Sequence, residues 1–289
     1  MAKKSTKDAL GDRMKDSYEN RSKTFLTRRV PVIIRLDGKA FHSFTKGFQR
    51  PYDSIFHTAM DKTLQYLCEN IQGCKFGYTQ SDEITLVLTD YETIQTCAWF
   101  DNNVQKICSI SASMATFAFN KYFAEAVNEE FNKSLSSLEV VKQLYGNTDN
   151  FDKVFNNYFN KINKGAMFDS RCFSVPQSEV INCLIWRQQD ATRNAIQMLG
   201  QTHFSHKQLN EKSTADIQDM LMLEKGINFN DMPVAFKRGV GCYRAEIPVT
   251  KVVDGETVTV MRHKWILDYN IPIFSQDREY LSQKIPKVD

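Results

Sequence analysis

The stretch from Val30 to His42 reads VPVIIRLDGKAFH, an apolar run that ends in an acidic residue, a glycine and a short polar turn. Successive side chains of a β-strand point to opposite faces of the sheet. The apolar face should carry four aliphatic residues, Val30, Val32, Ile34 and Leu36. Asp37 should project from the other face, with Ile33 and Arg35, and we expect it at the end of the strand.

A second run, KFGYTQSDEITLVL, spans Lys75 to Leu88 and has acidic residues in its middle. If the whole run alternates as one strand, Asp82 lies on the same face as Phe76 and Tyr78. Glu83 then points to the opposite face, so the two carboxylates should diverge.

The two runs together suggest a metal site. If they pair in one sheet, Asp37 and Asp82 can hold hard cations, which prefer oxygen ligands and keep positions open for substrate phosphates. Gly38 has no Cβ and would let the backbone approach a metal or a phosphate closely. The alternative is an acidic residue that caps a strand, followed by a surface turn.

Length and composition bound the class of protein. The chain has 289 residues, of which 42% are hydrophobic and 25% charged, as in soluble globular proteins. We find no apolar stretch long enough to span a bilayer and no secretory signal, so we expect a cytoplasmic protein without a membrane partner. Seven cysteines without a CxxC pair favour free thiols over disulfides or a zinc site.

The positive charge is concentrated at the N-terminus. Residues 1–29 carry nine Lys or Arg against four Asp or Glu, whereas the rest of the chain has a net charge of −2. Such an arm can attract a polyanion through phosphate contacts and counterion release. The alternative is a solvated helix that aids solubility.

The remaining periodicity predicts an α+β fold. Apolar residues recur at helical spacing over 55–71 and 98–127, and SRCFSV (170–175) is a candidate final strand. This order predicts a ferredoxin-like βαββαβ core. We expect a basic helical arm (1–29, helical over 5–27), a core (30–176) with a partly helical surface insertion (132–164), and a C-terminal part (177–289). That part should contain helices, with a break at Gly200 and a start at 213–216, and a hairpin with an Asp-Gly turn at 254–255.

Six motifs fall in the order found in one enzyme family. They are RLDGKAFHSF (35–44), YTQSDE (78–83), FDSR (168–171), WRQQDATRN (186–194), INFND (227–231) and KRG (237–239). In these motifs the chain resembles the tRNA(His) guanylyltransferases and their bacterial and archaeal relatives, the 3′-to-5′ polymerases. GDRMKDSYENR and QQDATRNAIQMLGQTHFS look more like the bacterial members.

The resemblance implies a polymerase palm-like fold and two Mg²⁺ ions about 4 Å apart. Asp37 and Asp82 would hold the ions, with the Gly38 carbonyl as a further ligand. ATP and GTP would be substrates, a tRNA or tRNA-like RNA the partner, and the enzyme a homo-oligomer, possibly a tetramer. The expected nucleotide site consists of Asp37, Gly38, Lys39, Ala40, Phe41, His42, Lys46, Arg50, Ser81, Asp82 and Lys106. The expected RNA contacts are Arg187, Arg193, Asn194, Lys237 and Arg238.

The chain departs from the family pattern in two places. Eukaryotic members carry a His-Ile-Asn-Asn-Leu-Tyr-Asn run after the WRQ segment, and here Thr192 stands at its histidine. The family's basic cluster at the start of the long helix is also reduced, since Asp101, Asn102 and Asn103 follow Trp99 and Phe100 here. Template-directed repair of 5′-truncated tRNA by nucleotide addition, through a 5′-adenylylated intermediate, therefore fits better than addition of G to tRNA(His).

Other functions remain open at this point. The same two-carboxylate palm serves nucleotide cyclases, and a non-catalytic RNA-binding protein is a further alternative. His203 and His206 could form a metal pair, although a structural or surface role is favoured. Trp99 and Phe100 could stack on a base, although core packing is favoured.

Overall fold

The computed structural model describes residues 9–135, 148–253 and 256–287. A six-stranded antiparallel sheet with strand order β4-β1-β3-β2-β5-β6 forms its centre. The four core strands are β1 (Val32–Gly38), β2 (Cys74–Gln80), β3 (Glu83–Leu88) and β4 (Phe168–Ser174). With helices α3 (Ser54–Asn70) and α4 (Val104–Leu135) between them, they form the predicted ferredoxin-like arrangement.

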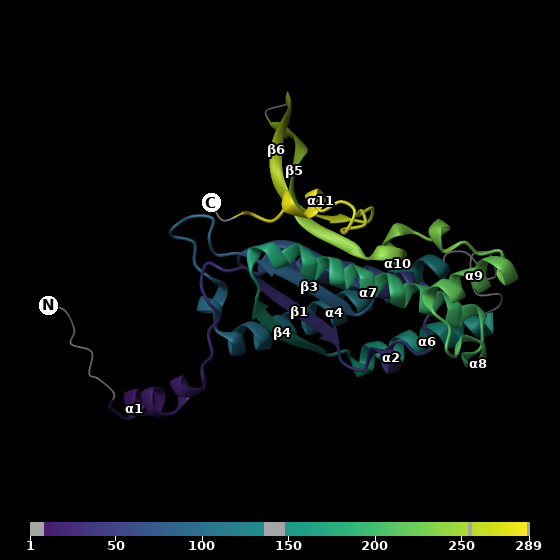
Figure 1. Ribbon diagram of the computed structural model, residues 1–289, viewed down its shortest axis with the longest axis horizontal. Helices are drawn as coiled ribbons and strands as arrows, with labels where there is room; N and C mark the ends of the chain where they lie inside the picture. The colour runs from purple at the N-terminus through teal and green to yellow at the C-terminus, as the bar shows by residue number, and fades with distance from the viewer. Residues whose placement is uncertain (1–8, 136–147, 254–255, 288–289) are drawn as a thin grey trace.

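Each face of the sheet has its own core. Helix α7 (Gln177–His203) crosses the front of the sheet in Figure 1, and α4 lies behind it. Ile34 and Leu36 of β1 pack on the side of α3 and α4, whereas Ile33 packs with Val180 and Leu184 of α7. The alternation predicted for the first strand is therefore confirmed, although β1 begins at Val32 and not at Val30.

The helix predicted over 55–71 is confirmed, and its start has a clear cause. The side chain of Asp53 accepts a hydrogen bond from the backbone N–H of Phe56 at 2.9 Å, which caps α3. The helix predicted over 98–127 starts later, at Val104. Trp99–Asn102 form the separate 3₁₀ turn η2, and Phe100 and Asp101 within it adopt left-handed backbone conformations that do not continue a right-handed helix.

Two expectations about the second half need correction. Helix α6 (Thr148–Lys164) belongs to the core and not to a surface insertion, since Phe151, Phe155 and Tyr158 are buried in it. Residues 136–147 of the expected insertion lie outside the described residues. Helix α7 also runs through Gly200 without a break. The glycine allows close packing, since a Cβ there would overlap Ile217 of the neighbouring helix.

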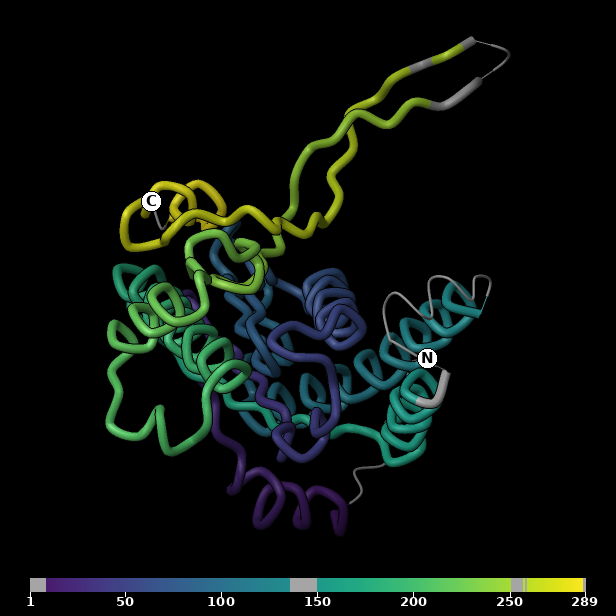
Figure 2. The backbone as a smooth tube through the Cα atoms, turned by 90° about the vertical axis from the view of Figure 1, so that its right-hand side faces the viewer, coloured from purple at the N-terminus to yellow at the C-terminus, as the bar shows by residue number. Residues whose placement is uncertain are grey.

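The C-terminal part contains the predicted helices and hairpin. The helices are α8 (His206–Leu209), α9 (Thr214–Lys225), the 3₁₀ turn η3 (Phe229–Asp231), α10 (Val234–Arg238) and α11 (Glu279–Ser282). The strands β5 (Val240–Val253) and β6 (Glu256–Asp268) form a hairpin that projects from the body of the molecule (Figure 2). Its predicted Asp-Gly turn lies outside the described residues.

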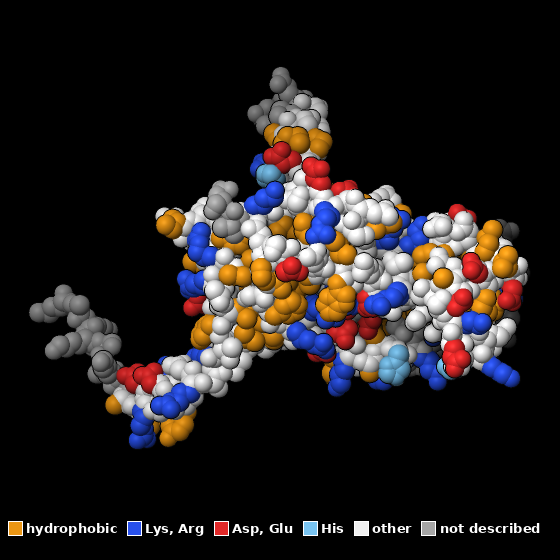
Figure 3. Space-filling view, in the orientation of Figure 1, with side chains coloured by type: hydrophobic (Ala, Val, Ile, Leu, Met, Phe, Trp, Pro, Cys, Tyr) orange, Lys and Arg blue, Asp and Glu red, His pale blue; other side chains and the backbone are white. Residues whose placement is uncertain are grey.

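The N-terminal arm is less helical than predicted. It consists of α1 (Ala9–Ser17) and the 3₁₀ turn η1 (Glu19–Ser22), after which residue Phe25 forms an isolated bridge with Asn103. Basic, acidic and apolar side chains all reach its surface (Figure 3). No helix in the described part of the chain is long and apolar enough to cross a membrane.

Candidate active site

The loop between β2 and β3 places Asp82. Gln80 pairs with Glu83 across a two-residue turn, in which Ser81 adopts a left-handed conformation with φ of 49°. The run from Lys75 to Leu88 is thus a hairpin and not one strand, so the alternation expected across it was wrong. Glu83, and not Asp82, lies directly across from Asp37 of β1.

The ends of β1, β3 and β4 bring carboxylates together. Asp37 pairs across the sheet with Glu83 on one side and with Asp169 on the other. The N–H of Gly38 donates to the carbonyl of Asp82 at 3.1 Å, which joins the turn to the end of β1. The residues of the two runs therefore meet at one edge of the sheet, as expected.

The protonation of both aspartates reflects this crowding. Burial, followed by the negative charge of Glu83 and of Asp169, raises the pKa of Asp37. Burial raises the pKa of Asp82 to about 6, and the charge of Asp37 contributes to the increase. The hydroxyl of Ser81 donates to Asp82 Oδ1 at 3.0 Å, and this hydrogen bond opposes the increase in the pKa of Asp82. A bound cation would relieve this repulsion.

Glu83 is already neutralised from within the protein. Arg35 donates to its carboxylate with Nη2–Oε2 at 2.9 Å, and Arg187 of α7 does so with Nε–Oε1 at 2.6 Å and Nη2–Oε2 at 2.8 Å. Asp169 lies 3.4 Å from a guanidinium nitrogen of Arg171, so among the described residues Asp37 and Asp82 are the carboxylates of this group without an ion-pair partner. Arg187, expected to contact RNA, is instead buried in this ion pair, with its side chain 5% exposed.

The donor set fits Mg²⁺. Carboxylate and carbonyl oxygens are the ligands this ion prefers, and it commonly takes one or two carboxylates together with water and substrate phosphates. Among the described residues no group of three or more His, Cys, Asp and Glu could hold a metal, which also leaves His203 and His206 without a ligand set. Any metal here would be held by the aspartate pair and by groups that the substrate supplies.

The loop after β1 holds the rest of the expected nucleotide site. Ala40 adopts a left-handed conformation and precedes the short helix α2 (Phe41–Phe44), and Lys39 and His42 are exposed on this loop. A Cβ at Gly38 would overlap the ring of Phe41. Gly38 is therefore required for packing against Phe41, a reason that the sequence did not indicate.

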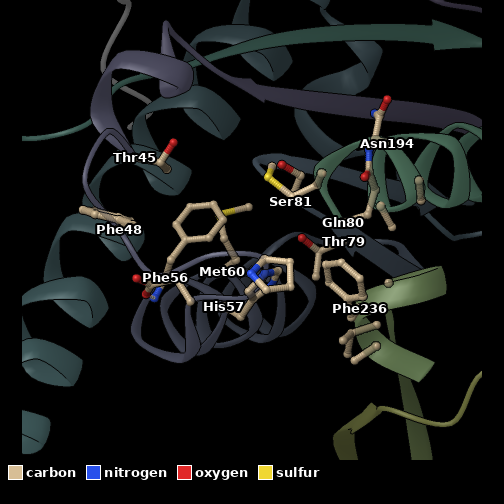
Figure 4. Close-up of a pocket in the computed structure, with 18 of the residues that line it drawn as sticks. Thr45, Phe48, Phe56, His57, Met60, Thr79, Gln80, Ser81, Asn194 and Phe236 are labelled. Carbon is tan, nitrogen blue, oxygen red and sulfur yellow. Dashed lines mark hydrogen bonds between the residues drawn. The ribbon is translucent and has the colours of Figure 1, made fainter. Parts of the chain in front are cut away.

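A cavity of about 120 Å³ opens beside this edge of the sheet. Ser81 borders it, so it is adjacent to Asp82. Figure 4 shows Ser81 and Asn194 on one side of the cavity and His57 and Met60 of α3 on the other. The aromatic residues that line it are Phe48, Phe56 and Phe236. Such flat apolar walls with a few polar groups suit a planar ligand such as a nucleobase.

The three cations expected at a triphosphate lie in different places. Arg50 lines the cavity. Lys46 lies near Lys161 and Lys164 of α6. Burial, followed by the positive charges of Lys164 and Lys46, lowers the pKa of Lys161. Thr116 marks the part of α4 that is near the carboxylates, because its hydroxyl accepts a hydrogen bond from the N–H of Phe168, next to Asp169. Lys106 lies ten residues before Thr116 on the same helix. It is thus roughly 15 Å away along α4, and the structure does not bring it to the site.

The residues expected to bind RNA are also divided. Asn194 lines the cavity, and Arg193 is exposed on α7, where it contacts Asp190 at 2.7 Å. Most of the Lys237 side chain is buried, and its Nζ donates to the carbonyl of Asn230, so its ammonium group is already hydrogen-bonded within the protein. Arg238 is half-buried, and its carbonyl accepts from the hydroxyl of Tyr78 at 2.6 Å. Trp99 is buried and Phe100 exposed.

Sequence reasoning missed two features of the site. The ion pair of Glu83 with Arg187 joins residues 104 positions apart, and only the WRQ and QSDE motifs could have indicated it. The imidazole of His57 lines the cavity but belongs to the helical pattern of 55–71, where it gave no separate signal.

Known proteins resemble this chain over most of its length. The family model for tRNAHis guanylyltransferase matches residues 11–176. A bacterial tRNA(His) guanylyltransferase-like protein in complex with ATP is 40% identical, covers 96% of this chain and 99% of its own, and has a TM-score of 0.74. Such a protein in complex with GTP is 37% identical, with coverage of 96% and 98% and a TM-score of 0.68.

A eukaryotic relative is more distant. The tRNA(His) guanylyltransferase of Saccharomyces cerevisiae is 27% identical over 224 residues, which is 72% of this chain and 80% of the yeast protein. The expected likeness to bacterial members is confirmed by the first two structures. The chain therefore belongs to the tRNA(His) guanylyltransferase family and is a nucleotidyltransferase.

Proposed function

We propose that this enzyme adds nucleotides to the 5′ end of a tRNA or tRNA-like RNA, directed by a template strand, in the 3′-to-5′ direction. The observation that carries the proposal is the hydrogen bond from Gly38 to the carbonyl of Asp82, which brings the turn that holds Asp82 to the end of β1 at Asp37, beside a cavity that can take a nucleobase. ATP and GTP are the proposed substrates, in line with the ligands named for the bacterial relatives.

The reaction consists of two phosphoryl transfers. In the first, an oxygen of the RNA 5′-monophosphate attacks the α-phosphorus of ATP, and pyrophosphate leaves. In the second, the 3′-hydroxyl of the incoming nucleotide attacks the 5′-phosphate that carries the adenylyl group, loses its proton, and AMP leaves. Two Mg²⁺ ions, when bound, would reduce the repulsion between the attacking oxygen and the phosphate and stabilise the leaving group.

The protein then contributes mainly position and charge. Asp37 and Asp82 hold the ions, and Ser81 orients the carboxylate of Asp82 through its hydroxyl. The loop from Asp37 to His42 is the proposed cradle of the triphosphate. Arg50 at the border of the cavity offers a forked guanidinium that can bind two phosphate oxygens.

A lysine cluster formed by Lys46, Lys161 and Lys164 is the proposed approach of the RNA. Lys161 donates to the carbonyl of Ser43 at 2.8 Å, which places the cluster beside α2. Within the described part of the chain no carboxylate lies within 4 Å of these three ammonium groups. Neighbouring cations without acidic partners are typical of a surface that binds a polyanion.

Repair is proposed over addition of G to tRNA(His) because of residue 192. The family's eukaryotic histidine is replaced by Thr192, whose hydroxyl lies 3.1 Å from the carbonyl of Gln188 and 3.0 Å from that of Lys237. This side chain is thus occupied with joining α7 to α10. It leaves no imidazole at that position to recognise a substrate.

The experiment is an addition assay on a 5′-truncated, monophosphorylated tRNA with labelled ATP, GTP and Mg²⁺. We expect an adenylylated RNA that is extended only opposite a pairing base. The variants Asp37→Ala and Asp82→Ala should bind the RNA but add nothing, with Lys106→Ala as a control of normal activity. Formation of a cyclic nucleotide without RNA would support a cyclase, and RNA binding without any transfer a binding protein. Full-length tRNA(His) as the preferred substrate would favour G addition.

A further inference from the structure

We propose that His57 determines which bases the nucleotide site accepts, by pairing with the group at position 6 of a purine. In one tautomer the imidazole accepts a hydrogen bond from the amino group of adenine, and in the other it donates to the carbonyl of guanine. The inference rests on the proposed function, because it places the base of the nucleotide in the cavity beside Ser81.

His57 forms part of the cavity wall. It lies on the first turns of α3, opposite Ser81 in Figure 4. A base that stacks among the aromatic residues of the cavity, with its triphosphate directed toward Asp82, would point its far edge at α3. The other α3 residues lining the cavity are the apolar Phe56 and Met60, so His57 is the polar side chain that α3 presents to that edge.

The imidazole of His57 is held in place by stacking, and its ring nitrogens make no hydrogen bond to the described residues. It stacks on the ring of Tyr52 with centroids 4.0 Å apart and planes 3° from parallel. Among the described residues neither ring nitrogen of His57 has a hydrogen-bond partner. His57 does bond to Asp53, but through its backbone N–H and not through the imidazole. Stacking thus fixes the plane of the ring and leaves its nitrogens for a ligand.

The protonation state suits this role. Burial lowers the pKa of His57 to about 4, so the ring is neutral at pH 7. A neutral imidazole has one donor and one acceptor nitrogen, and these exchange when the proton moves between them. A lysine in this place could only donate, and a carboxylate could only accept.

Such a residue suits a site that accepts either purine. Adenine carries a hydrogen-bond donor at position 6 and guanine an acceptor, and both ATP and GTP are proposed substrates. A pocket with a fixed donor or acceptor would reject one of the two, because a buried polar group left without a partner is costly. The two tautomers of His57 allow one pocket to take both.

The test compares equilibrium binding of ATP, GTP and purine riboside triphosphate, which has no substituent at position 6, in the presence of Mg²⁺. The wild-type protein should bind the first two about 2- to 13-fold more tightly than the third, as expected for one neutral hydrogen bond. His57→Leu should remove this difference without weakening the third nucleotide. His57→Gln, whose amide can rotate to donate or accept, should restore it.

Met60→Leu, in the same cavity wall, is the matched control and should retain the preference. Equal affinity of the wild type for all three nucleotides, or equal weakening of all three by His57→Leu, would overturn the inference and leave the proposed function intact. Absence of nucleotide binding by the wild type would overturn both. If His57→Leu does not fold, the wild-type ratio and His57→Gln decide the question.

Discussion

Replacing Arg187 by methionine should destabilise the protein by about 3 kcal/mol. If Arg187 instead contacted the RNA directly, the same substitution would lower the affinity for RNA. The side chains of Arg187 and Glu83 are only 5% and 9% exposed. Removing one partner of a buried pair costs about 3–5 kcal/mol, because the other charge stays buried. Arg35 still donates to Glu83 at 2.9 Å, so we expect the lower end of this range.

The assay is urea unfolding followed by fluorescence, together with RNA binding and nucleotide addition. Arg193→Met is the matched control, since this arginine lies on the same helix with its side chain 59% exposed and pairs with Asp190. An exposed pair of this kind contributes about 1 kcal/mol or less. In Arg187→Met we also expect slower addition at unchanged RNA affinity, because Glu83 adjoins Asp82 in the turn.

The outcome that refutes this reasoning is specific. If Arg187→Met unfolds at the same urea concentration as Arg193→Met and loses affinity for RNA, then Arg187 leaves its buried pair to bind RNA. The original expectation from the sequence would then be right.

Three further predictions concern other parts of the molecule. Burial raises the pKa of Asp61 to about 7, so the folded state keeps a proton that the unfolded state loses near pH 4, and stability falls as the pH rises between these values. The variant Asp61→Asn should therefore be more stable than the wild type by about 2–4 kcal/mol above pH 7 and by little at pH 4, as measured by urea unfolding at each pH. An equal change in the free energy of unfolding at both pH values would contradict this. Lys161→Glu should weaken RNA binding and reduce the slope of log K against log salt by about 0.7–0.9 per lost phosphate contact, whereas Lys106→Glu should leave the slope unchanged; equal effects would refute the lysine cluster. Gly38→Ala should cost about 1–3 kcal/mol by overpacking against Phe41, and Phe41→Leu in the same chain should recover part of the loss in thermal unfolding.

The core could be predicted because its signals are local. The alternation of β1 and the helical spacing of α3 follow from which face of each element is buried, and a single element carries that information. The start of α3 at Asp53 is equally local, since a cap acts over three residues. These features needed no knowledge of the neighbouring elements.

The site was only partly predictable because its arrangement depends on turns and distant partners. The alternation expected across Lys75 to Leu88 does not hold at Asp82, since a left-handed residue at Ser81 turns the chain and the alternation starts again at Glu83. The pairing of Glu83 with Arg187 is equally invisible to local patterns, as it depends on how α7 crosses the sheet. An arginine in a helical pattern gives the same signal whether it faces a carboxylate or solvent.

The two carboxylates of the hairpin thereby have separate roles, and the difference lies in the partners that folding supplies. Glu83 receives two guanidinium groups, so its charge is balanced within the protein and it can hold β3 against α7. Asp82 receives one serine hydroxyl and the repulsion of Asp37, so its charge is not balanced. A site that binds a cation must contain such an uncompensated charge, because a carboxylate already paired with arginine gains little from a metal. The buried ion pair thus supports the proposed metal site next to it without belonging to it.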